Sequence, residues 1–203
     1  MNVLNEEKDF EKKQEVIDAA INEFGDKGYE SASLNTILRE AGISKGSFYY
    51  HFKNKEGLYI FLVKMLAEEK KKFFAAHIDP ADFENKDIFS LFHILSKTGL
   101  EFARHNPYIN KFSQSFIKDH DSDIYQKVIK TMDFQANDYL HDLIENAYEK
   151  NELREDLPKE FTKRIMTYLF THIQDVASIS KVDDFETAAN HLIEFLKNGL
   201  SRK

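Results

Sequence analysis

Hydrophobic side chains recur every three or four residues along most of the chain, which is the pattern of amphipathic helices. Strand-like alternation of apolar and polar positions, internal repeats and low-complexity segments do not stand out. With seven glycines and three prolines, the chain is poor in the residues that the tight turns of β-rich proteins need. The sequence therefore predicts an all-α protein of about nine helices.

Four helices are expected in the first third of the chain, where glycine is concentrated. Five of the seven glycines fall within the first 57 residues, so short helices and tight turns belong there and longer helices follow. The first helix is amphipathic, with apolar side chains at helical spacing from Phe10 to Phe24. The caps and ends expected from residue type are Gly25–Gly28 after the first helix, Ser33 and Gly42 around the second, Ser44 before the third and Asn54 before the long fourth.

Pro80 marks a break, after which five further helices are expected. They cover about 87–105, about 109–117, the stretch between the acidic loop KDHDSD and Lys150, a helix with Pro158 in its first turn, and a last helix from Asp183 or Asp184 to about Gly199. We therefore expect short N-terminal helices followed by a helical bundle.

The chain is acidic overall, but one segment contains no acid. The formal net charge of −7 argues against a protein that coats nucleic acid through a global positive field. Residues 43–55, ISKGSFYYHFKNK, contain three lysines, a histidine and two adjacent tyrosines, and no carboxylate. Because a carboxylate would repel a DNA backbone, this composition is typical of a DNA-binding element.

Two short helices joined at EAGIS have the form of a helix-turn-helix, with Gly42 in the turn. On the second of them, Phe48 and Phe52 lie one turn apart and are expected to face the protein. Lys45 and Tyr49, also four residues apart, would then lie on an outward face. The N-terminal residues of such a helix read base edges in the major groove, while flanking side chains bind phosphate. Plain helix packing without DNA binding stays open as the alternative interpretation.

The segment AGISKGSFYYHFKNKEGLY resembles the signature of the tetracycline-repressor (TetR) family of bacterial transcriptional regulators. The resemblance extends back through AAINEFGDKGYESASLNTILREAGIS and covers about residues 10–60. The chain departs from the family pattern at Leu38, where a small residue is common, and at Gly57, which replaces a frequent glutamate and weakens a capping interaction. The DNA contacts that the resemblance implies fall on Ser33, Lys45, Gly46, Ser47, Tyr49, Tyr50, His51 and Lys55.

The last two expected helices carry wide apolar stripes, which suit either buried core or a surface shared with a partner. The resemblance implies a homodimer through a four-helix bundle, which places two recognition helices about 34 Å apart on a near-palindromic operator. It also implies a DNA-binding domain at residues 1–54 and an effector-binding and dimerisation domain at 55–203. The dimer interface is expected at Phe161, Ile165, Leu169, Val176, Phe185, Leu192, Phe195 and Leu196.

In the TetR family the fifth to eighth helices enclose an effector pocket, and the corresponding part of this chain is rich in phenylalanine. Aromatic side chains at helical spacing also suit a packed core, which remains the alternative for each of them. The expected function is that of a repressor released by a small, mainly apolar effector; a regulator gated by a protein partner is the alternative. The candidate pocket residues are Phe89, Phe92, Phe102, Phe112, Phe116, Tyr139, Tyr168 and His172.

Other kinds of chemistry find little support in the sequence. The absence of cysteine excludes disulfides, thiolate zinc sites and a cysteine nucleophile. With no HExxH, glycine-rich phosphate loop or GxSxG segment, we expect neither an enzyme nor a cofactor. The N-terminus has no apolar signal-peptide region, and the longest apolar run, YIFLV, is too short to cross a bilayer, which indicates a cytoplasmic protein without membrane contact. A solvated capping loop, rather than a metal site, is the interpretation for Asp119, His120, Asp121 and Asp123.

Overall fold

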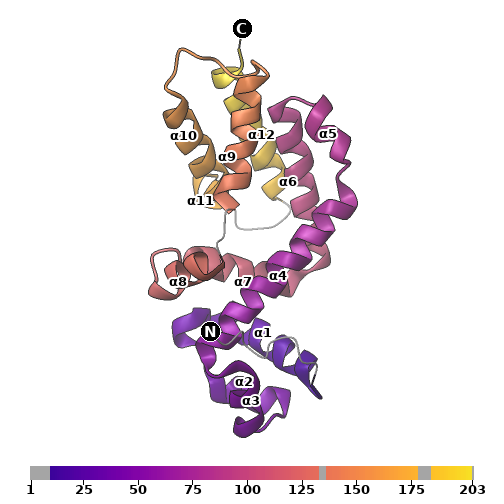
Figure 1. The fold of residues 1–203 in the computed structure, drawn as a ribbon, viewed down its shortest axis with the longest axis vertical. Helices are drawn as coiled ribbons and strands as arrows, with labels where there is room; N and C mark the ends of the chain where they lie inside the picture. Colours follow the sequence, from indigo (N-terminus) through magenta and orange to yellow (C-terminus); the bar gives the residue numbers. More distant parts are fainter. Residues whose placement is uncertain (1–9, 133–135, 178–183, 203) are drawn as a thin grey trace. The chain divides into compact units, whose positions relative to one another are not determined.

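The structure is a computed structural model that describes residues 10–132, 136–177 and 184–202, apart from the side chains at 132, 136–139, 171, 174 and 175. These residues form the helices α1 to α12 (Figure 1) and an isolated antiparallel bridge between Leu153 and Ser201. The predicted all-α class is confirmed. The described residues contain more helices than the nine expected; among the additions, a short helix follows Pro80 and the eighth expected helix is divided.

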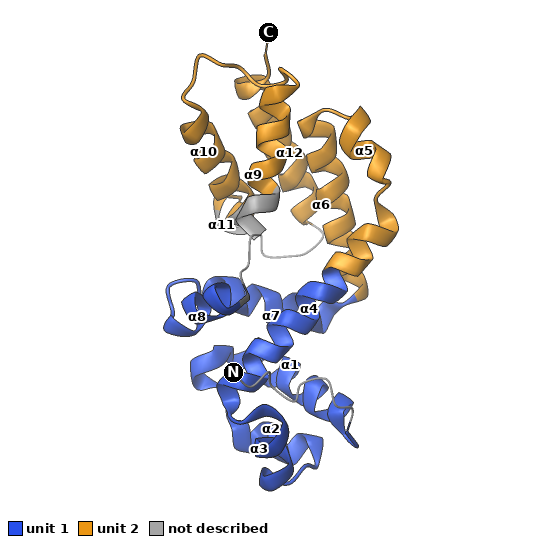
Figure 2. Cartoon of the chain, viewed as in Figure 1, with its two compact units in different colours: residues 1–70, 106–133 blue, residues 71–105, 134–203 orange. Residues whose placement is uncertain are grey.

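The helices belong to two compact units, which Figure 2 distinguishes by colour. Unit 1 comprises residues 1–70 and 106–133, and unit 2 comprises residues 71–105 and 134–203. Unit 1 contains α1 (Lys13–Ser31), α2 (Leu34–Ala41), α3 (Lys45–Phe52), the first part of α4 (Lys55–His77), α7 (Pro107–Lys118) and α8 (Asp123–Met132). Unit 2 contains the rest of α4, α5 (Pro80–Asn85), α6 (Ile88–His105), α9 (Ala136–Glu149), α10 (Lys159–Thr171), α11 (Ile173–Val176) and α12 (Asp184–Leu200).

The starts of α2, α3 and α4 are fixed by three polar side chains that the sequence identifies. Ser33 Oγ accepts a hydrogen bond from the amide of Thr36 at 3.3 Å, and caps α2. Ser44 Oγ caps α3 by accepting from the amide of Ser47 at 3.1 Å. The side chain of Asn54 accepts from the amide of Gly57, the third residue of α4, at 2.7 Å. Each bond satisfies an amide that has no partner within its own helix, so these predicted starts are confirmed.

The end of α1 differs from the sequence prediction. The helix was expected to stop at Gly25–Gly28 but continues to Ser31. Gly28 interrupts the helical geometry, with φ 71° and ψ 173°, and the helix resumes beyond it. A glycine adopts such a positive φ at low cost, so the expected terminator makes a kink instead of an end. The interpretation of Pro80 as a simple break also needs correction, because Asp79 caps α5 and Pro80 occupies its first turn.

Aromatic rings form the centre of unit 1. The ring of Tyr59 on α4 lies 4.8 Å from that of Phe24 on α1 and 5.4 Å from that of Phe112 on α7, between centroids. Burial raises the pKa of the Tyr59 hydroxyl well above its usual value. At Gly25, a Cβ atom would lie 3.3 Å from the backbone nitrogen of Phe112, so this glycine permits the close approach of α1 and α7. The α7 helix, distant in sequence, is thereby part of the framework that carries the helix-turn-helix.

A second core lies within unit 2, among α6, α9, α10 and α12. Ile88, Phe89 and Phe92 of α6 are buried there. The α6 helix begins after Asp87, whose carboxylate accepts hydrogen bonds from the amides of Phe89 and Ser90 at 2.9 and 3.0 Å. The other helices contribute Leu143, Ile144 and Ala147 of α9, Met166 of α10, and Ala189, Leu192, Ile193, Leu196 and Leu200 of α12.

Unit 1 extends well beyond the expected DNA-binding domain. Both α7 and α8 pack into it, and an ion pair of 2.6 Å between Lys127 and Glu56 joins α8 to α4. The division of the chain by packing therefore differs from the division by function that was drawn between residues 54 and 55, which stays a prediction. Within the described ranges, no helix combines the length and apolar character needed to cross a bilayer.

Candidate nucleic-acid interface

The α3 helix buries its two phenylalanines and exposes its first lysine and its two tyrosines. Phe48 and Phe52 are buried in the core of unit 1, as their spacing predicts. Lys45 is exposed at the first position of the helix, and Tyr49 and Tyr50 have 49% and 63% of their surface exposed. The outward face thus offers an ammonium group, two phenolic hydroxyls and the free amides of a helix N-terminus. These are donors suited to phosphate and base-edge oxygens.

Gly46 has no internal reason to be a glycine. A Cβ atom at this position would meet only Ser44 Oγ, at 3.9 Å, which is an ordinary contact. Glycine costs about 1 kcal/mol relative to alanine inside a helix. The residue therefore carries a stability cost that the fold itself does not require. A glycine lets a ligand approach the backbone closely, which is compatible with the predicted DNA contact at Gly46.

The turn between α2 and α3 is held in one conformation. Gly42 ends α2 with φ 61°, and the amide of Ile43 donates to the carbonyl of Leu38 at 3.1 Å. This is the pattern in which a left-handed residue closes a helix. The ammonium group of Lys12 donates to the carbonyl of Gly42 at 2.7 Å, so the turn is also attached to the start of α1.

A buried acid, Glu23, fixes the start of α2 and was missed by the sequence analysis. Its Oε1 accepts hydrogen bonds from the amide of Ser33 at 2.9 Å and from Lys27 Nζ at 2.8 Å. Burial raises the pKa of Glu23, but the hydrogen bonds from Lys27 and Ser33 outweigh it and hold the pKa below the ordinary value of 4.5. The signal was available, since Glu23 lies on the apolar stripe of α1 beside Ala20 and Phe24.

Two of the predicted phosphate-binding side chains point into the protein. The ring of His51 stacks on Phe10 with centroids 3.9 Å apart, and its Nδ1 is buried without a hydrogen-bond partner in the described part of the chain. Lys55 Nζ donates to the carbonyls of Tyr29 at 2.7 Å, Ala32 at 3.1 Å and Glu30 at 3.3 Å. The assignment of these two side chains to phosphate stays a prediction, whereas the contacts found are internal to unit 1.

The connection between α3 and α4 is unusually tight. Lys53 adopts φ 61° and ψ −48°, and the amide of Asn54 donates to the carbonyl of Phe52 at 2.6 Å. This is a γ-turn with positive φ, a rare and strained conformation for a residue with a side chain. A Cβ atom at Gly57 would overlap the same Phe52 carbonyl oxygen. Gly57 therefore has a steric role that the capping interpretation of the sequence did not foresee.

The eight predicted pocket residues do not gather around one described cavity. Phe89, Phe92 and Phe102 are buried in unit 2, whereas Phe112 and Phe116 pack in unit 1. In unit 2, Tyr168 is exposed and its ring stacks on His172 with centroids 4.2 Å apart. The side chain of Tyr139 lies outside the described residues. The pocket made of these residues stays a prediction.

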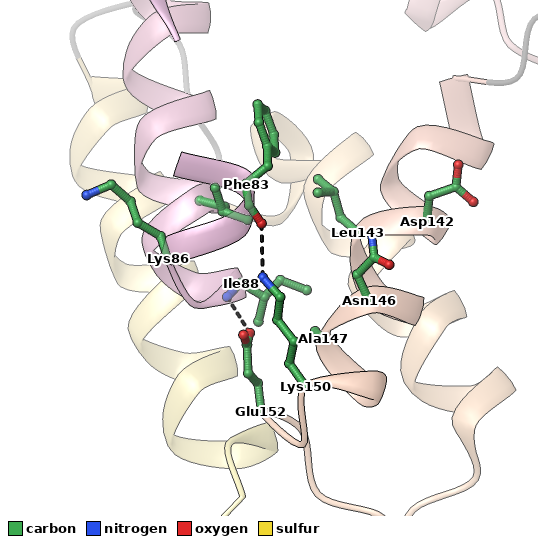
Figure 3. A pocket seen from close by; sticks show the side chains of 10 residues that line it. Phe83, Lys86, Ile88, Asp142, Leu143, Asn146, Ala147, Lys150 and Glu152 are labelled. Atoms are coloured by element: carbon green, nitrogen blue, oxygen red, sulfur yellow. Dashed lines mark hydrogen bonds between the residues drawn. The ribbon is translucent and has the colours of Figure 1, made fainter. Parts of the chain in front are cut away.

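Unit 2 contains a cleft of about 250 Å³ between α5, α6 and α9, drawn in Figure 3. Its lining includes none of the eight predicted residues. Lys150 Nζ donates across it to the carbonyls of Phe83 and Glu84, both at 3.0 Å, and Glu152 accepts from the amide of Ile88 at 2.7 Å. Because these charged groups are already bonded to the protein, they act as internal links between helices more than as groups presented to a ligand.

The predicted dimer residues separate into two sets. Phe161 and Phe195 have 53% and 69% of their surface exposed, and Ile165 and Val176 are exposed as well. Leu192 and Leu196 are buried in the core of unit 2, and Leu169 and Phe185 are partly buried against it. The stripes are therefore divided between buried core and exposed surface, and the dimer interface stays a prediction. Among the described residues, no group of three or more histidines and carboxylates could hold a metal ion.

Comparison with known proteins gives the same assignment for the N-terminal helices. Residues 16–60 match the family model of the bacterial regulatory proteins, tetR family. The biofilm operon icaADBC HTH-type negative transcriptional regulator IcaR of Staphylococcus epidermidis is 45% identical over 47 residues, which are 23% of this chain and 25% of that protein. The chain spans less than half the length of the first curated relatives it matches.

The similarity of fold extends over the whole chain. A TetR family transcriptional regulator from Chloroflexus aurantiacus superposes with a TM-score of 0.74 and 24% identity, covering 97% of this chain and 96% of that one. The regulator FadR from Bacillus subtilis in complex with stearoyl-CoA superposes with a TM-score of 0.68 and 18% identity, covering 92% and 98%. At these identities the superpositions establish a shared fold.

Proposed function

The chain belongs to the tetR family of bacterial regulatory proteins, and from that membership we propose that it regulates transcription in the cytoplasm by binding operator DNA through α3. The observation that carries the proposal is the exposed, acid-free face of α3. A protein with a formal charge of −7 keeps Lys45, Tyr49 and Tyr50 exposed together and free of any neighbouring acid along residues 43–55. Such a face binds the phosphate backbone and places the first turn of α3 at base edges.

The protein acts as a homodimer in this proposal. Exposed Phe161, Ile165, Val176 and Phe195 form an apolar set on α10, α11 and α12 that a second copy would cover. A two-fold dimer presents two α3 helices to half-sites about 34 Å apart, so the operator is expected to be a near-palindrome.

The proposed regulation is repression relieved by a small, mainly apolar effector. FadR of Bacillus subtilis, which shares the fold, has been solved with stearoyl-CoA, and IcaR is a negative regulator. By linkage, an effector that binds the DNA-free state better weakens operator binding by the same factor, typically about 5–150-fold. The proposed lining is the aromatic set of α6 together with Phe112, Phe116, Tyr139, Tyr168 and His172.

A regulator gated by a protein partner is the second candidate. It is favoured by the packing of Phe89 and Phe92, which are buried in the core of unit 2. It is also favoured by the lining of the described cleft, which includes none of the predicted pocket residues. The two candidates differ in whether an apolar small molecule alone releases the DNA.

The test is selection of a randomised duplex pool by the purified protein at about 150 mM salt, followed by sequencing. A recovered near-palindrome supports the dimeric DNA-binding head, and a Lys45→Glu variant that folds but retains nothing above background is the matched control. Failure of the folded wild-type protein to enrich any sequence contradicts the proposal. Release of the selected duplex by apolar small molecules then distinguishes effector control from control by a protein.

A further inference from the structure

We propose that Lys55 is a positioning residue for DNA binding. It ties the end of α1 to the start of α4, and so fixes where the helix-turn-helix lies, without contacting phosphate. The DNA-binding part of the inference rests on the proposed function, whereas the tie itself is a property of unit 1.

The geometry of the ammonium group accounts for all of its donors. A lysine ammonium has three N–H groups, and Lys55 Nζ lies within hydrogen-bond distance of the carbonyls of Tyr29, Glu30 and Ala32, at 2.7, 3.3 and 3.1 Å. It also lies 4.5 Å from the centroid of the Tyr29 ring, over the ring face. A phosphate oxygen could bind only by replacing one of these partners.

The carbonyls that Lys55 binds need a partner from outside their helix. The last four carbonyls of an α-helix have no intrahelical donor and carry the negative end of the helix dipole. The last turn of α1 contains no basic residue of its own. Lys55, from the first turn of α4, supplies the cation that this helix end lacks.

The same short segment is held from its other side by an acid. The carbonyl of Ala32 accepts a hydrogen bond from Lys55, and the amide of the next residue, Ser33, donates to Glu23 at 2.9 Å. Ser33 is the cap of α2, which leads through the turn at Gly42 into α3. A cation and a buried acid therefore fix the point at which the helix-turn-helix leaves α1.

Lys45 provides the contrast. It is exposed at the first position of α3 and makes no hydrogen bond or ion pair with the part of the chain that the structure describes. Its ammonium group is available to phosphate, whereas that of Lys55 is already satisfied. The two lysines of the same acid-free segment thus have different predicted contributions to DNA binding.

The test compares Lys55→Gln with Lys45→Gln on the duplex recovered by selection. The measurements are the dissociation constant as a function of salt concentration and the thermal unfolding midpoint without DNA. Each phosphate contact contributes about 0.9 to the slope of log affinity against log salt. We expect Lys45→Gln to reduce the slope by about that amount and leave the unfolding midpoint unchanged. Lys55→Gln should weaken binding roughly tenfold with an unchanged slope and lower the unfolding midpoint.

Two further variants keep the inference testable if Lys55→Gln does not fold. In Lys55→Arg the positive charge remains, but a planar guanidinium cannot match three carbonyls arranged around an ammonium, so weaker binding at an unchanged slope is expected. In Glu23→Gln the other half of the tie is weakened, and its effect on affinity should be non-additive with that of Lys55→Arg.

A reduced slope in Lys55→Gln with an unchanged unfolding midpoint, or full affinity in Lys55→Arg with an unchanged midpoint, overturns the inference in favour of a phosphate contact. Wild-type protein that binds no duplex contradicts the proposed function instead. In that case the unfolding midpoints of Lys55→Gln and Lys55→Arg still test the tie. The tie requires both midpoints to lie below that of the wild type.

Discussion

At the scale of single residues, the helix-turn-helix depends on one charged group that is buried beneath its surface. Glu23 lies on the buried stripe of α1 and accepts two hydrogen bonds, one of them from the amide that begins α2. A buried acceptor that loses its donors costs about 1–3 kcal/mol, which is a large share of the stability of a small domain. The carboxylate of Glu23 therefore stabilises the connection between α1 and the helix-turn-helix.

Glu23→Gln is expected to lower the free energy of unfolding of unit 1 by about 1–2 kcal/mol at pH 7, because the amide keeps one acceptor but loses the charge. The pKa of Glu23 is lowered in the folded state, so its contribution is present above the ordinary value of 4.5 and is lost as the pH falls through the folded value. The variant should therefore lack part of the acid destabilisation that the wild type shows below about pH 4.5.

Urea unfolding between about pH 3 and pH 7, in steps of about one pH unit, measures both the loss of stability at pH 7 and its dependence on pH. The control is Asp18→Asn, which alters an exposed carboxylate of the same helix and should change stability by less than about 0.5 kcal/mol. If the free energy of unfolding of the wild type and of Glu23→Gln decreased equally as the pH falls, the carboxylate would not be linked to folding.

The residue scale is also where the sequence was least informative. Phe48 and Phe52 were placed in the core correctly because helical spacing alone decides which face they share. The sequence predicts a DNA contact for Lys55, and nothing in the local sequence reveals that the carbonyls at the end of α1 lie beside its ammonium group. Contacts between residues 26 positions apart depend on how the helices pack, which residue type does not encode.

At the scale of helices, α3 is too short to be stable by itself. It has eight residues, and isolated helices shorter than about 12 residues are marginal in water. Its stability comes from the packing of its two phenylalanines and from its cap, Ser44. The first turn, which is expected to meet DNA, is therefore ordered by a single side-chain hydrogen bond.

Ser44 substitutions separate the order of α3 from its charge. Ser44→Ala should cost about 1 kcal/mol of stability and weaken operator binding, because the first turn of α3 loses its cap. Ser44→Asp should keep the stability, since aspartate is an equally good cap, yet weaken binding through repulsion of phosphate. Thermal unfolding and operator titration distinguish the two variants. Operator binding by Ser44→Asp at wild-type affinity would mean that this helix start does not face DNA.

Helix limits could be predicted wherever a local signal sets them. Gly42, Ser44 and Asn54 act through bonds to residues within four or five positions, so their types suffice to place the ends of α2, α3 and α4. Gly28 misled the prediction because its positive φ is compatible with either an end or a kink. Beyond Gly28, the last turn of α1 is in contact with Lys55 at the start of α4, and only the fold supplies that contact.

At the scale of the whole molecule, α10, α11 and α12 carry exposed apolar side chains that the proposed dimer would cover. Phe161, Val176 and Phe195 each have more than half of their surface in contact with solvent. Scattered exposed apolar residues are normal, and Ile117 on α7 is one of them, but the group of four on the elements predicted to dimerise favours an interface there. The apolar stripes could be recognised from the sequence, whereas their division between core and surface required the packing of α12 on α6.

Phe195→Asp is expected to weaken dimerisation by at least about tenfold, because an aromatic side chain buried at an interface contributes on the order of 2 kcal/mol. Operator affinity should fall with it, since one half-site is lost per monomer. Tyr108→Asp is the matched control: its ring is 66% exposed, on α7, outside the predicted interface. Sedimentation velocity over a range of concentrations measures the change. Dimers of equal strength in both variants would place the interface elsewhere.

The predicted effector pocket stays a prediction, and its eight residues are the part of the proposal that the sequence defines least. The spacing of Phe112 and Phe116 correctly indicates that they face the interior of the protein, but not which interior. Both lie in unit 1, while Phe89 and Phe92 lie in the separate core of unit 2. Periodicity reports that a side chain is buried, and only the path of the chain decides what it is buried against.

The tight connection between α3 and α4 has a consequence for how this sequence can diverge. The carbonyl of Phe52 occupies the space that a side chain at residue 57 would need, and the conformation of Lys53 puts it there. A lineage that acquires the glutamate frequent in the family at position 57 must therefore rebuild the turn at 53 in the same step or before it. Positions 53 and 57 should therefore vary together among descendants of this protein. A change of the turn at 53 should precede or accompany a change at 57, and should never follow it.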